Sequence, residues 1–407
     1  KLEGALAENT LASDDKVYVL ELVVPGIPCT IETEKSIVRT GYLDLPDYSF
    51  RSTSESVIES RFSIKTNSSN EIKYKAYNTK IEPAISNDGD YKVYKWEVKN
   101  IPVVKRETGS RGVADYQARV DISPLYFDYD GYPGTMASWK DFGMWRFPFY
   151  DEPKPFSPEK IEFLKSLVKD LHTEEEKITT LYKYLQNETR YVFIAYGIGG
   201  LKPFPASFVE SKKYGDCKAL SNYMKHMLQA VGIKSYTASI TAGPNNILFD
   251  PEFVSNRSNH IIVCVPLASK DTMWLECTSK QTRPGFLGSS TENRNALLIT
   301  EKGGVLVNTP VSKADNSKWI SVTNAIIEED GSALLESRVF VSGEFWPYID
   351  AYVNGRSKEE IKKALVNAFG FKTPDDLEVK ILADSADGHL VDIKLAYSQF
   401  FDFKAGS

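Results

Sequence analysis

One turn, Lys213-Tyr214-Gly215-Asp216-Cys217, constrains the fold of this chain more than any other stretch because it leads directly into an apolar helical repeat. Gly215 permits a tight turn, and Asp216 has the short carboxylate that caps helix N-termini. Apolar residues then recur at helical spacing until Gly232. They are Ala219, Leu220, Tyr223, Met224, Met227, Leu228 and Val231. The pattern predicts a buried helix that begins at Cys217.

Cys217 therefore falls in the first turn of the predicted helix. The unpaired backbone N–H groups and the positive end of the helix dipole favour thiolate over thiol there, which is what a nucleophile needs. A cysteine at this position also fits a purely structural role as a small buried side chain. The turn by itself leaves both interpretations open.

A histidine and an acidic residue downstream complete a candidate catalytic triad. His260 opens an apolar, β-rich run, and Glu276 lies in a second short strand, with residues 266–272 as the predicted hairpin turn. If His260 pairs directly across from Glu276, both side chains project near each other on one sheet face. A thiolate, a general base and a carboxylate that fixes the imidazole tautomer are the parts of such a triad.

The order cysteine, histidine, acid resembles the transglutaminase-like superfamily of papain-type cysteine enzymes. Three segments resemble, more specifically, bacterial multidomain proteins in which a transglutaminase-like core is flanked by β-rich domains called DUF3857 and DUF3858. These segments are Leu185 to Val192, Gly197 to Ala206 and Tyr214 to Lys218. The sequence departs from its relatives at Glu276, where an Asp-Pro-Thr motif usually supplies aspartate, and at Ala219-Leu220, where Asp-Lys often follows Cys-Lys.

The resemblance implies an α+β chain with a papain-like core, an N-terminal β-sandwich-type domain and a smaller C-terminal β-rich domain. We place these domains at residues 156–305, 1–155 and 306–407, respectively. The resemblance also implies thioester chemistry on a peptide or protein amide, with a cell-surface substrate as one option and without a cofactor. It implies a location in the periplasm or cell envelope. Hydrolysis is the favoured reaction and transfer to an amine a second option. A catalytically inactive binding or assembly scaffold is the alternative.

Four further residues are tentative candidates for an oxyanion or substrate-binding role. Gln186 could donate to the oxyanion, or could satisfy a loop carbonyl as a buried helix glutamine. Gly199 and Gly200 lie in a loop just before the nucleophile and allow close backbone approach, although glycines also serve simple turns. Asp216 adjoins the nucleophile itself.

The regions flanking the core show two features. Residues 1 to about 150 are β-rich, and the alternation in 57–65 predicts one dry face with Ile58, Phe62 and Ile64. Residues 126–150 are unusually aromatic, with ten aromatic residues in twenty-five. They form either an aromatic wall that covers the cleft or a packing segment between the β-rich domain and the core.

Composition excludes several classes of function. The net charge is −6 without a long block of one sign, which argues against a nucleic-acid surface or a polybasic membrane patch. No apolar stretch is long enough for a transmembrane helix. Because the chain starts at Lys1 without a signal-peptide pattern, we expect a mature or trimmed product. The oligomeric state stays open.

The cysteines and histidines outside the triad show no metal-binding pattern. Cys29, Cys264 and Cys277 form no CxxC pair, and we expect all three to pack as small apolar side chains. The hairpin register above would place Cys264 opposite residue 272. The remaining histidines lack clustered ligands, so we expect no metal site.

Overall fold

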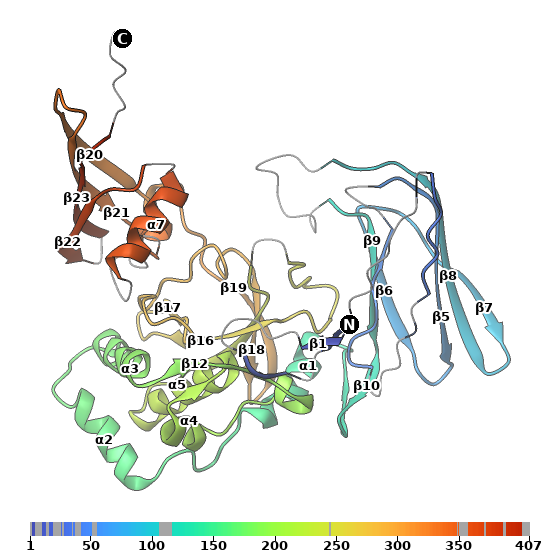
Figure 1. The fold of residues 1–407 in the computed structure, drawn as a ribbon. Coiled ribbons are helices and arrows are strands. Elements are labelled where there is room, and N and C mark those ends of the chain that lie inside the picture. Colours follow the sequence, from blue (N-terminus) through green and yellow to red (C-terminus); the bar gives the residue numbers. More distant parts are fainter. Residues whose placement is uncertain are drawn as a thin grey trace. The chain divides into compact units, whose positions relative to one another are not determined.

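The computed structural model describes residues 2–4, 10–13, 16–18, 26, 28–34, 36, 42–50, 55–105, 116–243, 246–347, 349, 357–369, 372–385 and 388–400. It divides into two compact units, and their elements are labelled in Figure 1. The first comprises Lys1–Lys280 and Asn293–Thr309, and the second comprises Gln281–Glu292 and Pro310–Ser407. The three domain boundaries predicted from the sequence stay a prediction.

The N-terminal part of the first unit is a β-sandwich of two three-stranded antiparallel sheets (Figure 1). One sheet has the order β4 (Tyr48–Ser49), β9 (Arg119–Pro124), β6 (Ile72–Tyr77). The other has the order β5 (Val57–Asn67), β8 (Tyr91–Ile101), β7 (Ala84–Asp88). Aromatic and β-branched side chains from both sheets form one core, among them Tyr48, Tyr94, Trp96, Val120 and Ile122. The predicted β-sandwich is confirmed.

The predicted dry face of β5 is wrong at one residue. Phe62 and Ile64 pack against the sandwich core, whereas Ile58 is 82% exposed. The pairing with β8 skips Ile58, since Val57 pairs with Ile101 and Glu59 with Lys99. Asn100, which would face Ile58, has a left-handed backbone with φ of 54°. This local irregularity interrupts the alternation that the sequence suggests.

Three short strands precede the sandwich in the chain. They are β1 (Leu2–Gly4), β2 (Thr10–Ser13) and β3 (Lys16–Tyr18). Strand β1 pairs with β3, and β2 pairs in parallel with β13 (Phe193–Ala195) of the core region.

The aromatic segment joins the sandwich to the core as a packing element. It forms the hairpin β10 (Tyr126–Tyr129) and β11 (Tyr132–Thr135), helix α1 (Trp139–Arg146) and the 3-10 turn η2 (Phe147–Phe149). Its buried rings cluster with residues from both sides of the seam. This cluster contains Leu43, Phe127, Trp139, Phe142, Phe249, Val254 and Leu297. These contacts support the packing interpretation of the segment.

The core is built on a five-stranded antiparallel sheet with the order β17-β16-β15-β18-β19. The strands are β15 (Tyr236–Ile240), β16 (His260–Pro266), β17 (Thr272–Leu275), β18 (Asn295–Thr300) and β19 (Gly303–Asn308). The sheet is antiparallel throughout. The three inner strands β16, β15 and β18 are almost completely buried, whereas the edge strands β17 and β19 are partly exposed.

Helix α5 (Cys217–Ala230) packs against this sheet, and three other helices of the core pack around α5 (Figure 1). They are α2 (Pro158–Val168), α3 (Glu174–Glu188) and α4 (Ala206–Lys212). Proline opens α2 after the cap Ser157, and Thr173 with Glu176 forms the capping box of α3. The predicted start of α5 at Cys217 is confirmed. Helix α5 is buried along its length between the other helices and strand β16.

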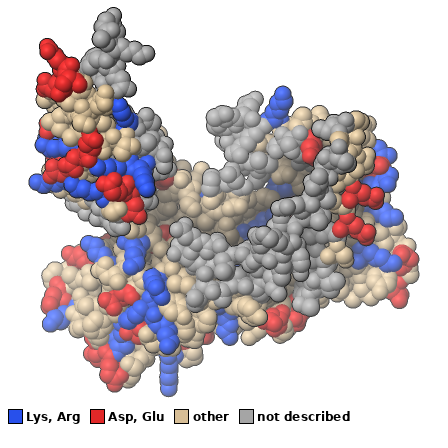
Figure 2. Space-filling view, in the orientation of Figure 1, with Lys and Arg blue, Asp and Glu red and all other residues tan. Residues whose placement is uncertain are grey.

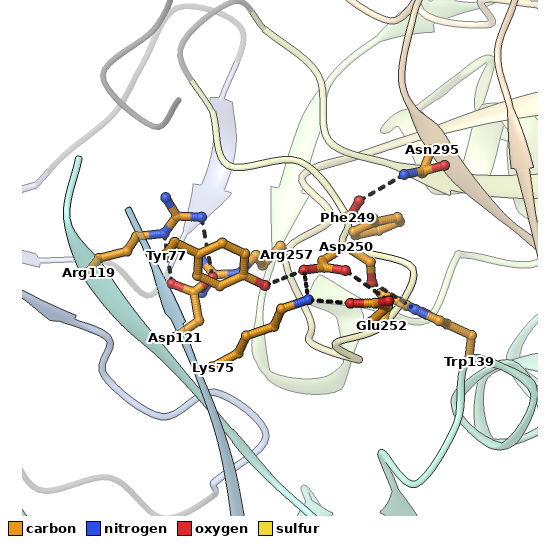
Figure 3. Close-up of polar contacts among 10 residues, drawn as sticks. All are labelled: Lys75, Tyr77, Arg119, Asp121, Trp139, Phe249, Asp250, Glu252, Arg257 and Asn295. Carbon is orange, nitrogen blue, oxygen red and sulfur yellow. Dashed lines mark hydrogen bonds and ion pairs between the residues drawn. The ribbon is translucent and has the colours of Figure 1, made fainter. Parts of the chain in front are cut away.

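The loop that leads into β16 docks on the sandwich through charged side chains (Figure 3). Asp250 accepts hydrogen bonds from Lys75 at 2.7 Å and from the Tyr77 hydroxyl at 2.5 Å. Arg257 forms ion pairs with Asp47 and with the buried Asp121. Burial raises the pKa of Asp121, although Arg257 and Arg119 act in the opposite direction. The sandwich thus holds the loop only three residues before His260.

The second unit is a four-stranded antiparallel sheet with one helix on it (Figure 1). The sheet order is β20 (Trp319–Ile327), β21 (Ala333–Val341), β23 (Gly388–Tyr397), β22 (Asp376–Ser385), and the helix is α7 (Lys358–Phe369). Strands β20 and β21 form an antiparallel hairpin. The unit also includes residues 281–292, whose Ser289 donates to the Glu344 carboxylate.

Acidic and basic side chains are interspersed over the described surface in the view of Figure 2. Several form exposed ion pairs, such as Arg338 with Asp392 and Lys394 with Glu336 on the C-terminal sheet. Exposed pairs of this kind stabilise a fold by only about 0–1 kcal/mol. No helix in the described part of the chain is long and apolar enough to cross a membrane.

A glycine contact provides a test of how α1 packs on the sheet. A Cβ added at Gly143 would lie 2.0 Å from the backbone nitrogen of Gly304, so α1 must move away from β19. We expect Gly143→Ala to destabilise the protein by about 1–3 kcal/mol through overpacking. This exceeds the gain of about 0.5–1 kcal/mol that alanine brings to a helix. Urea denaturation would measure the change.

Gly199→Ala is the matched control for Gly143→Ala. A Cβ at Gly199 meets no atom within 4 Å, so the midpoint should stay near that of the wild type. Equal stability of the two variants would contradict the packing of α1 described above.

Candidate active site

The N-terminus of α5 holds Cys217 in a fixed position. The carboxylate of Asp216 caps the helix and accepts the Ala219 N–H at 3.0 Å. A Cβ at Gly215 would lie 2.8 Å from the Ala219 Cβ, so the turn before the helix requires glycine. The second carboxylate oxygen of Asp216 pairs with the buried Lys218 amine. The Cys217 side chain lies in this first turn and is only 7% exposed.

His260 and Glu276 lie at the ends of two adjacent strands and contact each other directly. His260 is the first residue of β16, and Glu276 follows the last residue of β17. The His260 Nε2 lies 2.8 Å from the Glu276 Oε2. The Cys217 side chain is among the groups that raise the pKa of the His260 imidazole. Because Nε2 contacts Glu276, Nδ1 is the ring nitrogen that remains for an interaction with Cys217.

The charges of the site favour a protonated imidazole beside an ionised carboxylate. Burial lowers the pKa of His260, but the Glu276 carboxylate and the Cys217 side chain outweigh burial and raise it to about 10. Burial raises the pKa of Glu276, but His260 and Thr278 outweigh burial and hold it below its usual value. An imidazolium next to Cys217 is the partner that stabilises a thiolate.

Two residues that the sequence did not single out hold Glu276 in place. The Thr278 hydroxyl and N–H both donate to the Glu276 Oε1, at 2.6 and 3.2 Å. The Tyr182 hydroxyl donates to the Glu276 backbone carbonyl at 2.6 Å. Thr278 could have been found from its position two residues after the acid. Tyr182 could not, because it belongs to the apolar stripe of α3 and looks like a packing residue.

A hydrogen bond also ties the helix of the nucleophile to the strand of the base. The Ser221 hydroxyl donates to the Ile261 carbonyl at 3.0 Å, and Ser221 is fully buried. Ser221 lies one helical turn beyond Cys217, and Ile261 follows His260. The contact therefore fixes the distance between nucleophile and base from outside the triad.

The predicted register between His260 and Glu276 is wrong by two residues. Cys264 lies opposite Trp274 instead of residue 272, and the hairpin closes with the pair of Pro266 and Thr272. Backbone hydrogen bonds within residues 267–271, with Lys270 in the left-handed conformation, fix this loop length. A shift of two residues keeps each side chain on the same sheet face. Glu276 therefore still reaches His260, from a diagonal position.

The tentative binding residues have different surroundings. The Gln186 side chain donates to the Ser279 carbonyl at 3.0 Å, which is the loop-carbonyl role. Asp216 is buried as a cap and ion-pair partner. Gly199 and Gly200 lie in the 3-10 turn η3 (Gly197–Gly200), where an added Cβ at either residue meets no atom within 4 Å. Neither steric crowding nor a positive φ requires glycine at these two positions.

The environments of the other three cysteines differ from that of Cys217. Cys264 and Cys277 are buried free thiols, and burial raises the pKa of Cys264 to about 12. Cys29 is exposed, so the prediction that it packs is wrong. It lies in the described segment 28–34, which has neither helix nor strand and is exposed throughout.

Two family models match the sequence. Residues 161–278, which include Cys217, His260 and Glu276, match the transglutaminase-like superfamily. The chain carries a transglutaminase-like core. Residues 2–105 match DUF3857, a domain of unknown function with a solved structure. The DUF3858 character of the C-terminal region stays a prediction. No curated protein matches the sequence.

Solved structures with similarity to this transglutaminase-like protein share little sequence with it. A "putative protease" from Parabacteroides distasonis is 14% identical with a TM-score of 0.48, and the match covers 86% of this chain and 68% of that chain. A "putative cysteine protease" from Cytophaga hutchinsonii is 10% identical with a TM-score of 0.26, covering 57% and 73%. The periplasmic domain of TgpA from Pseudomonas aeruginosa is 14% identical with a TM-score of 0.24, covering 58% and 76%.

The ion pair in the transglutaminase-like core predicts a pH dependence of stability. Because the pKa of His260 is raised by folding, its contribution is complete below the unfolded pKa of about 6.5 and is lost as the pH rises toward about 10. We expect the free energy of unfolding to fall between pH 7 and 9.5 more steeply in the wild type than in Glu276→Gln. Urea denaturation at several pH values would measure both slopes.

Glu175→Gln is the matched control, because this exposed glutamate of α3 lies outside the site. Its slope should equal that of the wild type. A Glu276→Gln slope as steep as the wild-type slope would contradict the raised pKa of His260.

The Thr278 contact predicts a graded pair of variants. Thr278→Val removes the hydroxyl donor to Glu276, and a hydrogen bond to a charged group is worth about 1.5–3 kcal/mol. We expect a loss of stability of about 1–2 kcal/mol, at the low end because the backbone N–H remains. Thr278→Ser keeps a hydroxyl and should recover most of it. Similar denaturation midpoints for the valine and serine variants would show that the hydroxyl does not support Glu276.

Proposed function

We propose that this protein is a cysteine enzyme that acts on peptide or protein amides through a thioester on Cys217. One observation carries the proposal. The His260 imidazole lies 2.8 Å from the Glu276 carboxylate, and the Cys217 side chain at the N-terminus of α5 is close enough to raise the pKa of this imidazole. Nucleophile, base and orienting acid thus have the contacts that cysteine-based acyl transfer requires.

The same contacts assign each residue a step. The Cys217 thiolate attacks the amide carbonyl carbon, and the electron pair of the C=O bond moves to the oxygen. When the tetrahedral intermediate collapses, the C–N bond breaks and His260 Nδ1 gives its proton to the leaving amine. Water, deprotonated by His260, then attacks the thioester and releases the acid and the thiolate. Glu276 stays ionised and keeps the imidazole oriented.

Hydrolysis is the reaction that we propose, with an amine as the alternative acceptor. A peptide or protein substrate, its origin at the cell surface and a periplasmic or cell-envelope location are supported by the family resemblance. His260 and Cys217 can use either water or an amine as the acceptor, because water and an amine would each give a proton to the same imidazole nitrogen.

A binding or assembly scaffold is the second candidate function, and one observation favours it. Cys217 is only 7% exposed, so a substrate carbonyl must displace neighbouring atoms to reach it. A protein that has lost the enzymatic activity would keep the fold while Cys217 stays buried. The reactivity of Cys217 separates the two functions.

Alkylation by iodoacetamide, located by peptide mass spectrometry, tests the proposal in the wild type and in His260→Ala. We expect Cys217 to react fast well below pH 8 in the wild type, because the imidazolium stabilises its thiolate. His260→Ala should shift the rise of the rate with pH to higher values and slow the reaction about tenfold or more at pH 6.5, since general-base partners contribute about 10²–10⁴-fold.

Cys29 and Cys264 are internal references in every sample. Cys29 is exposed and should react like an ordinary thiol, while the buried Cys264 should react slowly in both proteins. A Cys217 that follows the Cys29 profile, or that stays unmodified in both proteins, would favour the scaffold over the enzyme.

A further inference from the structure

Acyl transfer by Cys217 needs hydrogen-bond donors for the oxygen that becomes negative in the tetrahedral intermediate. One donor is the backbone N–H of Cys217, since the first N–H groups of a helix have no acceptor within the helix. The sequence suggested Gln186 as a second donor. Its amide instead donates to the Ser279 carbonyl. A second donor must come from another residue.

We propose that the Tyr191 hydroxyl is this second donor and hydrogen-bonds the oxyanion formed when Cys217 attacks a carbonyl. The inference deepens the function proposed above and rests on it. It makes Tyr191 a catalytic residue in addition to Cys217, His260 and Glu276.

The backbone places Tyr191 beside the turn that carries the nucleophile. Strand β12 (Arg190–Tyr191) pairs in parallel with β14 (Tyr214–Gly215), and Tyr191 lies next to Gly215. Backbone hydrogen bonds fix this register, from Arg190 to the Lys213 carbonyl at 3.1 Å and from Val192 to the Gly215 carbonyl at 2.9 Å. Tyr191 thus lies beside Gly215, two residues before Cys217 in the chain.

The same register sets the direction of the Tyr191 side chain. Paired residues of adjacent strands project to the same face of a sheet. A Cβ at Gly215 would lie 2.8 Å from Ala219 and 3.6 Å from Leu220 in the first turns of α5, and 3.4 Å from Val209 of α4. The Tyr191 ring therefore projects toward α4 and the start of α5, and it packs against the core cluster that contains these residues.

The hydroxyl of Tyr191 is available as a donor. Within the described residues it has no hydrogen-bond partner, whereas the buried Tyr182 hydroxyl donates to Glu276 and that of Tyr223 to Glu210. Burial and the negative charges of Cys217, Asp216 and Glu276 raise the pKa of Tyr191 to about 12. The phenol thus keeps its proton at neutral pH, and those charges act on it because it lies close to the triad.

Two reagents distinguish oxyanion stabilisation from other effects on Cys217. With p-nitrophenyl acetate, the thiolate attacks the ester carbonyl, the oxygen takes the electron pair, and p-nitrophenolate leaves as the thioester forms. With iodoacetamide, the sulfur displaces iodide from a CH₂ carbon, and no oxyanion forms. Only the first reaction needs Tyr191 as a donor.

The experiment compares both rates at Cys217, located by peptide mass spectrometry, in the full chain and in Tyr191→Phe. We expect the phenylalanine variant to acylate Cys217 about 100-fold more slowly, because removing one oxyanion donor costs about 10²–10³-fold in rate. Its alkylation rate should stay within about twofold of the wild type. Cys217→Ser identifies the background of acetylation at other residues.

Tyr196→Phe is the matched control, because Tyr196 follows in the same segment and is 69% exposed. It should leave both rates unchanged. If Tyr191→Phe leaves acylation unchanged, or lowers acylation and alkylation equally, Tyr191 is not an oxyanion donor and the proposal is overturned. If wild-type Cys217 is not acylated and its alkylation is independent of His260, the proposed function itself fails.

Discussion

The candidate site depends on the packing of α5 against β16, because this contact sets where Cys217 lies relative to His260. Helix α5 is buried between α3, α4 and the sheet, and the buried hydrogen bond from Ser221 to the Ile261 carbonyl ties the two elements together. Cys217 and His260 are each at the first position of their element. Small shifts of the helix along the strand would therefore separate them, and close packing prevents such shifts.

Glu276 accepts hydrogen bonds from residues in separate parts of the core. His260 and Thr278 serve the Glu276 carboxylate, and Tyr182 of α3 serves its backbone carbonyl. The Glu276 side chain has several torsion angles, and these donors restrict them. Hydrogen bonds thus fix both the carboxylate and the backbone of Glu276. A carboxylate in a fixed position holds the imidazole of His260 in one tautomer.

The N-terminal sandwich contacts the loop that leads into β16. Asp250 and Arg257 lie in the loop that enters β16, and their partners on the sandwich are Lys75, Tyr77 and Asp121 (Figure 3). Trp139 of the aromatic segment donates to the Asp250 carbonyl at 3.1 Å. The sandwich and the aromatic segment therefore both support the loop that ends at His260, although neither supplies a triad residue.

The sequence by itself determined the elements whose signals are local. The cap Asp216 and the apolar repeat predicted α5 and its first residue, because these patterns depend on residues three or four apart. The tertiary structure decided what depends on distant residues: the partner of Gln186, the two-residue register of the hairpin, and the hydrogen bond of Tyr182 to Glu276. A hydroxyl or amide chooses among acceptors only after packing has brought them within about 3 Å, and no sequence pattern records that choice.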